Sequence, residues 1–319
     1  MKYLFLVLCF GFSSCLWAKP SDKITALTPK AKRDFDTSQI GQIYANNAIY
    51  TIHLSKIKTQ KTAPKSYKIF YILDGNGHLP IALNALSKAG FLYEELESVL
   101  IISIGYGGEY EGVAFPALRK RDYTPKYKLD CDDGGDFWGS SFVGTDFSND
   151  DSLGGGADKF LQTLQNDIIP FTRSFVQERL GAELQAKSGI FGHSFGGLFV
   201  LYALSNSSGN FSHFYAVSPS LWWGGGEFID IDFGNIKVDY ATLWIMQDEI
   251  NQVSKVSEAS KESGAKIRTA KINSKELAHL IESQSNIKPI YKAFYGHTHG
   301  SVVAPAFLHA ISDFAKSRF

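Results

Sequence analysis

One serine in this sequence stands in a pattern that is typical of a catalytic nucleophile. In Gly192-His193-Ser194-Phe195-Gly196, a glycine lies two residues before the serine and another two residues after it. Such glycines let the backbone turn sharply from a strand into a helix, and the serine hydroxyl then stands clear of the sheet. The pattern predicts Ser194 as a nucleophile, and the competing interpretation is a glycine-rich turn with a surface serine.

The segments on both sides of Ser194 favour the catalytic interpretation. Residues 188–193 are typical of a short buried strand, and residues 197–204 form a mostly apolar helical pattern. A glycine-serine-glycine pattern alone is common, so the prediction depends on this flanking strand and helix.

A histidine is needed next, because a serine hydroxyl attacks only when a base takes its proton. His297 and His299 follow the last predicted strand and precede the last predicted helix. We expect His299 to be the base, since Gly300 and the helix start can turn its ring toward Ser194, and His297 to shape the loop. The alternative is an H-x-H metal pair, but no cluster of His, Cys and carboxylates completes such a site, so we expect no metal.

An acid should orient this imidazole from the end of a strand that lies between Ser194 and His299 in the chain. Asp248 and Glu249 directly follow the apolar run 241–246. We favour Glu249, with Asp248 as the alternative. Acids at strand ends are also common in solvated loops. The third possibility is therefore that neither acid reaches His299.

The tetrahedral intermediate of acyl transfer needs two converging amide donors. One is expected from the residue after the nucleophile, Phe195, and the other from the loop after an earlier strand. Gly75 and Asn76 follow the apolar run 67–73 in a glycine-rich turn. We expect the second donor to be the amide of Asn76 or that of Gly75.

The wider pattern predicts a mostly parallel sheet with helices on both faces. Residues 48–54 and 67–73 alternate like strands around a turn at 60–66, which predicts an antiparallel opening. Helical patterns then alternate with short apolar runs, as in α/β proteins. These runs are 99–104, 189–192, 213–217, 241–246 and 289–294.

Three further segments have recognisable patterns. Residues 158–180 form a long helical pattern that Pro170 should break or kink, and the last helix is expected at 303–316. Residues 126–156 contain many aspartates and glycines, together with Trp138, and show no period. We expect a loop over the active-site edge there, with a solvated acidic loop as the alternative.

The first eighteen residues are typical of a cleaved secretory signal. Lys2 is followed by an uncharged apolar stretch, and small residues precede the polar boundary after Ala18. The alternative is a lipoprotein anchored through an acylated Cys15. We therefore expect a periplasmic or secreted protein with a signal at 1–18, an N-terminal lead-in at 19–45 and one domain at 46–319.

Charge and cysteine content exclude several function classes. The chain has 32 basic and 32 acidic side chains, and residues 1–18 remove only Lys2, so the mature chain is nearly neutral. We expect no nucleic-acid partner, and no membrane partner unless Cys15 is lipidated. Cys9 and Cys15 lie in the signal, which leaves Cys131 alone and excludes an intrachain disulfide.

Six segments between residues 73 and 302 form a recognisable set, and the resemblance that they carry covers about residues 45–316. They are Leu73-Asp-Gly-Asn, Arg121-Asp-Tyr-Thr-Pro, Gly155-Gly-Ala-Asp-Lys-Phe, Gly192-His-Ser-Phe-Gly-Gly, Ser218-Pro-Ser-Leu-Trp-Trp and His299-Gly-Ser-Val. As a set they resemble the Putative esterase (esterase D-like) family of α/β-hydrolases. Within it they are most similar to the periplasmic siderophore trilactone esterases of the ferric-enterobactin and salmochelin type.

This resemblance implies an α/β-hydrolase fold without a cofactor, with Ser194 as nucleophile and His299 as base. Some members of the group work with a Ser-His dyad, so the resemblance leaves the acid open. It also implies a serine esterase that opens the ester bonds of a catecholate siderophore trilactone and so releases iron in the periplasm.

A ferric tris-catecholate is bulky, aromatic and triply anionic, so its site should be aromatic and locally basic. Side chains in three segments could supply positive charge or flat aromatic faces. The alternatives are that the arginines form a solvated basic turn and that the tryptophans belong to the core. The candidate substrate contacts are Arg121, Arg119, Trp222, Trp223 and Trp138.

Two other functions fit the same residues. A carbohydrate-linked aryl or acetyl esterase, or a thioesterase, would use the same fold and the same catalytic groups. A protein that holds an iron siderophore without hydrolysing it is an alternative of another class, although Ser194 and His299 argue against it.

Overall fold

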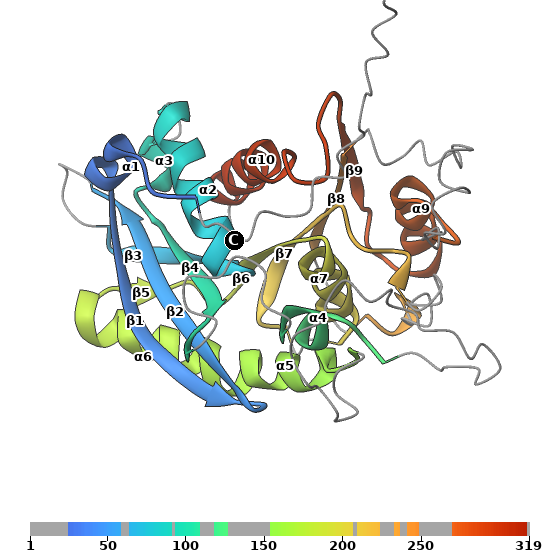
Figure 1. The fold of residues 1–319 in the computed structure, drawn as a ribbon, viewed down its shortest axis with the longest axis horizontal. Coiled ribbons are helices and arrows are strands. Elements are labelled where there is room, and N and C mark those ends of the chain that lie inside the picture. The colour runs from blue at the N-terminus through green and yellow to red at the C-terminus, as the bar shows by residue number, and fades with distance from the viewer. Residues whose placement is uncertain are drawn as a thin grey trace, which may run out of the picture.

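The computed structural model describes residues 25–58, 64–90, 93–108, 118–126, 154–206, 209–223, 233–236, 241–248 and 270–317. The strands in these ranges form one nine-stranded sheet, and helices cover both of its faces (Figure 1).

The sheet is mostly parallel. Its strand order is β1-β2-β4-β3-β6-β7-β8-β9, and β5 pairs with β3 beside this path. The β1–β2 and β2–β4 pairs are antiparallel, and every other described pair is parallel. The strands are β1 (Phe35–Ala45), β2 (Ala48–Ile57), β3 (Ser66–Ile72), β4 (Val99–Tyr106), β5 (Glu183–Leu184), β6 (Ser188–His193), β7 (Phe211–Val217), β8 (Thr242–Asp248) and β9 (Ile290–Phe294).

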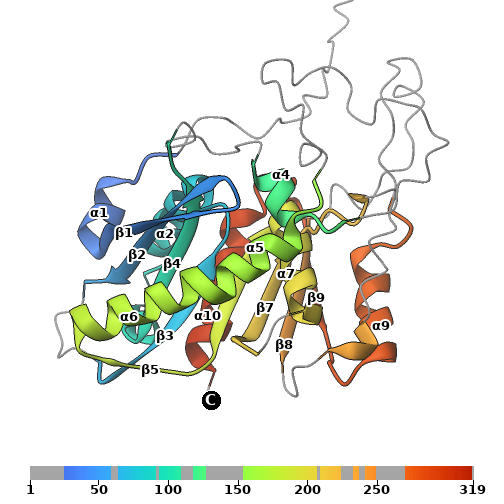
Figure 2. The same ribbon diagram turned by 90° about the horizontal axis from the view of Figure 1, so that it is seen from below.

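The helices form two layers around the sheet. On one face, α1 (Pro29–Asp34), α2 (Gly75–Ala89), α3 (Tyr93–Leu96) and α10 (Val303–Lys316) contribute to one apolar cluster. On the other face, the cluster contains residues of α4 (Leu118–Tyr123), α5 (Ala157–Thr163), α6 (Ile169–Leu180), α7 (Phe195–Asn206) and α9 (Ser274–Gln284). Figure 2 shows α5 and α6 in front of the sheet.

The central strands are apolar along their whole length because both of their faces are buried. In β3, Ile69 and Tyr71 belong to one apolar cluster, whereas Phe70 and Ile72 belong to the other. Side chains of successive strand residues point to opposite faces, so a continuous apolar run fills both layers. The predicted parallel sheet with two helical layers is thus the observed architecture.

The antiparallel opening differs from the prediction. The two expected partners correspond to β2 and β3, but β4 lies between them, and β1 is the strand that forms a hairpin with β2. Most side chains of β1 are exposed or half-buried, since β1 is an edge strand. Its polar sequence therefore lacks a clear alternation, and the predicted lead-in at 19–45 in fact contains α1 and β1.

Two helical predictions agree with the structure. The last helix, α10, has the expected bounds, and the long pattern around Pro170 is interrupted as expected. The turn Leu164–Ile168 is a π-helix, and α6 begins at Ile169, so Pro170 stands in the first turn of α6, where its missing N–H is not needed.

Two further observations complete the description of the fold. Most of the loop expected at 126–156 lies outside the described residues. Among the helices of the described ranges, none combines the length and the apolarity that a membrane span requires.

The carboxyl ends of the parallel strands bring the predicted site residues to one edge of the sheet. Asp74 follows β3, Ser194 follows β6, and Asp248 is the last residue of β8. His299 lies between β9 and α10. Ligand sites of open α/β sheets lie at this edge, so the fold places the candidate groups where such a site forms.

Candidate active site

Ser194 occupies a strained turn between β6 and α7. Its φ is +61°, a left-handed conformation that is uncommon for a residue with a side chain. The turn is held by its N–H, which donates to the carbonyl of Val217 at 2.9 Å. The Ser194 hydroxyl lies 3.2 Å from the hydroxyl of Ser220. This strand-turn-helix geometry is the one that the glycine-flanked pattern predicts for a nucleophile.

Two glycines let the backbone come close enough to make this turn. A Cβ on Gly192 would overlap the carbonyl oxygen of Gly196, and a Cβ on Gly197 would lie 2.7 Å from the carbonyl oxygen of Val217. Both contacts are with backbone atoms, which cannot move away as a flexible side chain can. Helix α7 can therefore approach β6 and β7 only with glycine at these two positions.

His299 meets a carboxylate on its Nδ1 side. The Nδ1 atom lies 3.5 Å from Oδ1 of Asp248. The His299 side chain is 39% exposed, whereas Asp248 is fully buried at the end of β8. Asp248 was the alternative acid in the sequence analysis, and the favoured Glu249 lies outside the described residues.

The surroundings of Asp248 favour its ionised form. Gln247 donates a hydrogen bond to Asp248 Oδ1 at 2.9 Å, and the backbone N–H of Asp248 donates to the Ser218 hydroxyl at 3.2 Å. Burial alone would raise the pKa of Asp248, but the contacts with His299 and Ser218 outweigh it, so the pKa lies below its ordinary value. The carboxylate is thus charged at neutral pH and attracts an imidazolium.

Two buried histidines, His193 and His78, lie in a row beside His299. The ring centre of His193 lies 4.4 Å from that of His299 and 5.6 Å from that of His78. Burial, followed by the neighbouring His299, lowers the pKa of His193 well below its ordinary value, and burial also lowers the pKa of His78. Both rings are therefore neutral at pH 7 and add no positive charge beside His299.

The loop that carries His299 is organised by its own side chains. His297 Nδ1 lies 3.3 Å from the Ser301 hydroxyl, which also accepts the N–H of Thr298 at 2.9 Å. His297 thus contacts the loop itself, which agrees with the role expected for it.

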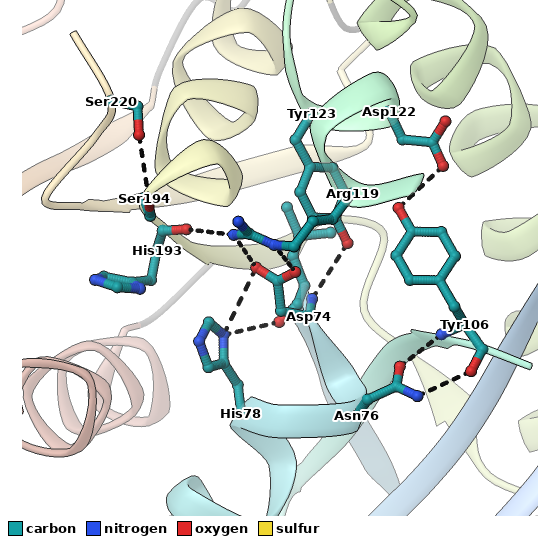
Figure 3. A network of polar contacts seen from close by, with 11 residues as sticks. Asp74, Asn76, His78, Tyr106, Arg119, Asp122, Tyr123, His193, Ser194 and Ser220 are labelled. Atoms are coloured by element: carbon teal, nitrogen blue, oxygen red, sulfur yellow. Dashed lines mark hydrogen bonds and ion pairs between the residues drawn. The ribbon is translucent and has the colours of Figure 1, made fainter. Parts of the chain in front are cut away.

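The expected oxyanion donors come from two helix starts. Phe195 is the first residue of α7, and Gly75 and Asn76 are the first residues of α2. A Cβ on Gly75 would lie 2.9 Å from the backbone of Ile104, so only glycine fits there. The Asn76 side chain accepts the N–H of Tyr106 at 2.6 Å and donates to its carbonyl at 2.9 Å, which ties the start of α2 to β4 (Figure 3).

The predicted basic contacts have internal partners instead. Arg119 is buried and forms a bidentate ion pair with Asp74, so its charge is paired inside the fold. Arg121 donates from Nε to Asp122 at 2.7 Å, and its side chain is 13% exposed. Charge in a sequence says nothing about burial, and these two guanidinium groups are paired with carboxylates inside the fold.

The predicted aromatic contacts divide into three cases. Trp223 is fully buried, and its indole N–H donates to the carbonyl of Pro125 at 3.0 Å, so it is a core residue that offers no open face. Trp222 is half-buried, with its ring centre 5.5 Å from that of Phe195. Trp138 lies outside the described residues.

Sequence reasoning assigned no role to two serines that contact the candidate catalytic residues. Ser218 and Ser220 follow β7, the neighbour of β6, and they contact Asp248 and Ser194 respectively. The signal that could have found them is their position, because they follow a strand that ends at the same edge as the nucleophile. In the part of the chain that the structure describes, no group of three His, Cys or acidic residues could hold a metal ion.

Comparison with known proteins finds similarity to esterases. The family model described as Putative esterase matches residues 134–263. The siderophore enterobactin esterase of Emericella nidulans is 26% identical over 266 residues, which are 76% of this chain and 80% of that protein. The apo-salmochelin esterase of Escherichia coli is 34% identical over 168 residues, which are 51% of this chain and 45% of that protein.

The fold is also that of a solved hydrolase structure. The siderophore hydrolase EstA from Aspergillus nidulans superposes with a TM-score of 0.68 at 22% identity and covers 92% of this chain and 97% of its own. The predicted α/β-hydrolase fold and the predicted resemblance to the Putative esterase family and the siderophore esterases are therefore confirmed.

The close backbone approach at the elbow predicts a specific cost for one added methyl group. Gly192→Ala should lower the free energy of unfolding by about 1–3 kcal/mol, because its Cβ overlaps a backbone oxygen. Gly196→Ala is the comparison, since the nearest neighbours of its Cβ would be side-chain atoms, Asp74 Oδ2 at 3.3 Å and Leu73 Cβ at 3.6 Å. Urea unfolding followed by circular dichroism measures both, and a loss for Gly196→Ala as large as that for Gly192→Ala would contradict this steric account.

Proposed function

We propose that this serine hydrolase of the Putative esterase type hydrolyses the ester bonds of a catecholate siderophore trilactone. The observation that carries the substrate class is the similarity to the enterobactin esterase, which extends over 266 residues and 80% of that protein. The site supports the reaction class, because Ser194, His299 and Asp248 lie at one edge of the sheet in the chain order of α/β-hydrolases.

In the proposed mechanism, Ser194 attacks an ester carbonyl of the trilactone ring. With the His299 Nδ1–H directed at Asp248, Nε2 is the basic nitrogen that takes the serine proton. The same proton then passes to the departing alkoxide, which leaves as a hydroxyl, and an acyl-enzyme ester remains on Ser194. Water, activated by His299, cleaves this ester and restores the serine, so each cycle consumes one water and opens one ester bond.

The tetrahedral intermediates carry a negative charge on the former carbonyl oxygen. We assign its stabilisation to the amide of Phe195 and to an amide at the start of α2, from Gly75 or Asn76. Both positions are helix N-termini, where backbone N–H groups point out of the helix and the helix dipole favours an anion.

The acid in this proposal is Asp248. Its role is to orient the His299 ring and to stabilise the positive charge that the ring acquires. It is buried, it carries a depressed pKa and it faces Nδ1. A charged carboxylate in this position fixes the imidazole tautomer and stabilises the imidazolium that forms during attack.

For substrate contact, Trp222 remains a candidate aromatic face, because it is half-buried beside Phe195. Arg119 and Arg121 are excluded as free cations by their carboxylate partners. We further propose that residues 1–18 are a cleaved secretory signal and that the enzyme acts in the periplasm, where a ferric siderophore would release its iron after ring opening.

The substrate assignment predicts the products of one reaction. The mature protein should convert ferric and iron-free enterobactin to linear trimer, dimer or monomer, and Ser194→Ala should lower the rate by at least about 10⁴-fold, since it removes the nucleophile. Chromatography with mass detection follows the products. Unchanged enterobactin together with Ser194-dependent hydrolysis of aryl or acetyl esters would retain the hydrolase and reject the siderophore. Tight binding of unchanged ligand would instead favour a carrier.

The assignment of the acid predicts different effects for two adjacent carboxylates. Asp248→Asn should lower kcat by about 10²- to 10⁴-fold, because an amide cannot stabilise the imidazolium. Glu249→Gln is the matched control and should stay close to the wild-type rate. Steady-state kinetics on one ester substrate measures both, and the reverse order of effects would reassign the acid to Glu249.

The proposed signal predicts the N-terminus of the exported protein. Expressed in a Gram-negative host, the chain should be recovered from the periplasm with Lys19 as its first residue, which intact mass and N-terminal sequencing detect. Cys15→Ser should leave this product unchanged, because Cys15 lies in the removed segment. A lipid-modified N-terminus at Cys15 in the membrane fraction, lost in Cys15→Ser, would establish the lipoprotein instead.

A further inference from the structure

A buried ion pair connects the two elements that supply the proposed oxyanion donors. Arg119 donates from Nε to Asp74 Oδ1 at 2.6 Å and from Nη2 to Asp74 Oδ2 at 2.8 Å. The same Nη2 lies 3.4 Å from the carbonyl oxygen of His193, the residue before the nucleophile. Figure 3 shows the Arg119 guanidinium between the Asp74 carboxylate and this carbonyl.

Asp74 sets the direction in which α2 begins. Its φ is +55°, a left-handed conformation that is strained for a residue with a side chain. Its carbonyl accepts the N–H groups of Gly77 and His78 at 3.0 and 2.9 Å, and its own N–H donates to the Tyr123 hydroxyl at 3.2 Å. The turn at Asp74 therefore determines where the amides of the next two residues point.

The ion pair also contacts the elbow on the far side of the nucleophile. The Arg119 guanidinium lies 5.4 Å from the ring centre of Phe195, whose amide is the other proposed donor. A Cβ on Gly196 would lie 3.3 Å from Asp74 Oδ2, so the carboxylate rests against the first turn of α7. Three residues that flank the nucleophile in the elbow, 193, 195 and 196, thus pack around one charge pair.

An ion pair in this place is better suited to fixing geometry than to stabilising the fold. Removing two charges from water carries a large desolvation cost, which the attraction between them offsets only when the geometry is good. The planar guanidinium and the carboxylate meet through two parallel hydrogen bonds, which fix both distance and orientation. Oxyanion donors need such control, since they must lie 2.7–3.1 Å from the developing charge.

We propose that the Arg119–Asp74 ion pair is a positioning device that sets the separation of the two oxyanion donors, the Phe195 amide and the amide at the start of α2. Neither side chain touches the substrate. The inference rests on the proposed ester hydrolysis, but it does not depend on which ester is cleaved.

The proposal predicts that variants of the ion pair stabilise the transition state less well but bind the substrate as tightly as the wild type does. Arg119→Lys keeps the charge but loses the two parallel bonds, and Asp74→Asn keeps the shape but loses the carboxylate. Both should lower kcat by about 10- to 10³-fold while KM stays close to wild type, because removal of one oxyanion donor costs about 10²- to 10³-fold. Hydrolysis of a small p-nitrophenyl ester measures this without any siderophore.

A second experiment measures how well the oxyanion donors bind a negatively charged oxygen. A boronic acid that forms a tetrahedral adduct on Ser194 places a negative oxygen where the intermediate has one, so its Kd should rise in parallel with the loss in kcat. If the wild-type protein cleaves no ester, the proposed function fails, whereas the boronate affinities of the wild type and the variants still test the positioning role.

Two controls separate positioning from general stability. Asp313→Asn disturbs another part-buried polar cluster, in which Asp313 accepts from Tyr215 at 2.8 Å and from Trp244 at 3.1 Å. It should lower the melting temperature and leave kcat unchanged. Tyr123→Phe removes one hydrogen bond to Asp74 without unpairing a buried charge, so it should fold even if the ion-pair variants do not, and should show a smaller parallel loss in kcat and boronate affinity.

Two results would overturn the proposal. If the folded fraction of Arg119→Lys, Asp74→Asn or Tyr123→Phe keeps the wild-type kcat and boronate affinity, the ion pair serves stability alone. If KM rises while kcat stays constant, Arg119 acts on ground-state binding instead.

Discussion

The close approach of α7 to the carboxyl ends of β6 and β7 is the constraint on which the site depends. Backbone atoms occupy the volume that side chains would need at Gly192 and Gly197. This proximity lets the Ser194 N–H reach the Val217 carbonyl, which holds the serine in its left-handed turn. The hydroxyl position is therefore determined by interior packing between layers, which is far more rigid than a surface loop.

The same conformation recurs at the ends of three neighbouring strands. Asp74, Ser194 and Ser218 follow β3, β6 and β7, which are adjacent in the sheet, and all have positive φ values of 55°, 61° and 41°. Strained residues of this kind persist only where the surrounding contacts hold them. Each has such contacts, from Tyr123 and Arg119, from Val217, and from Asp248. Backbone strain is thus found at one edge of the sheet, in the proposed nucleophile and in residues that we propose position the catalytic groups.

The sequence predicted those parts of the site that depend on short segments of the chain, and it did not predict those that depend on contacts between distant residues. The elbow and the His299 loop depend on short segments, so their positions were predictable. Asp248 and Glu249 are adjacent, and because successive strand residues point to opposite faces, a small error in the strand end selects the wrong acid. The role of Arg119 was not predictable, since its partner Asp74 is 45 residues away and only the fold buries both. The edge strand β1 was missed because its exposed side chains carry no alternation.

The pairing of Arg119 and Arg121 with carboxylates changes how the enzyme can recognise an anionic substrate. A charge with a partner at 2.6–2.7 Å produces only a weak, dipolar field a few ångströms away, so neither guanidinium attracts a distant anion as a free cation would. Their charge instead acts at short range, on the shape of the protein itself. In the proposed function, catalytic geometry and substrate recognition therefore depend on different residues. Interior contacts between the end of β3, α4 and α7 support the reaction, and other groups at the site select the ester.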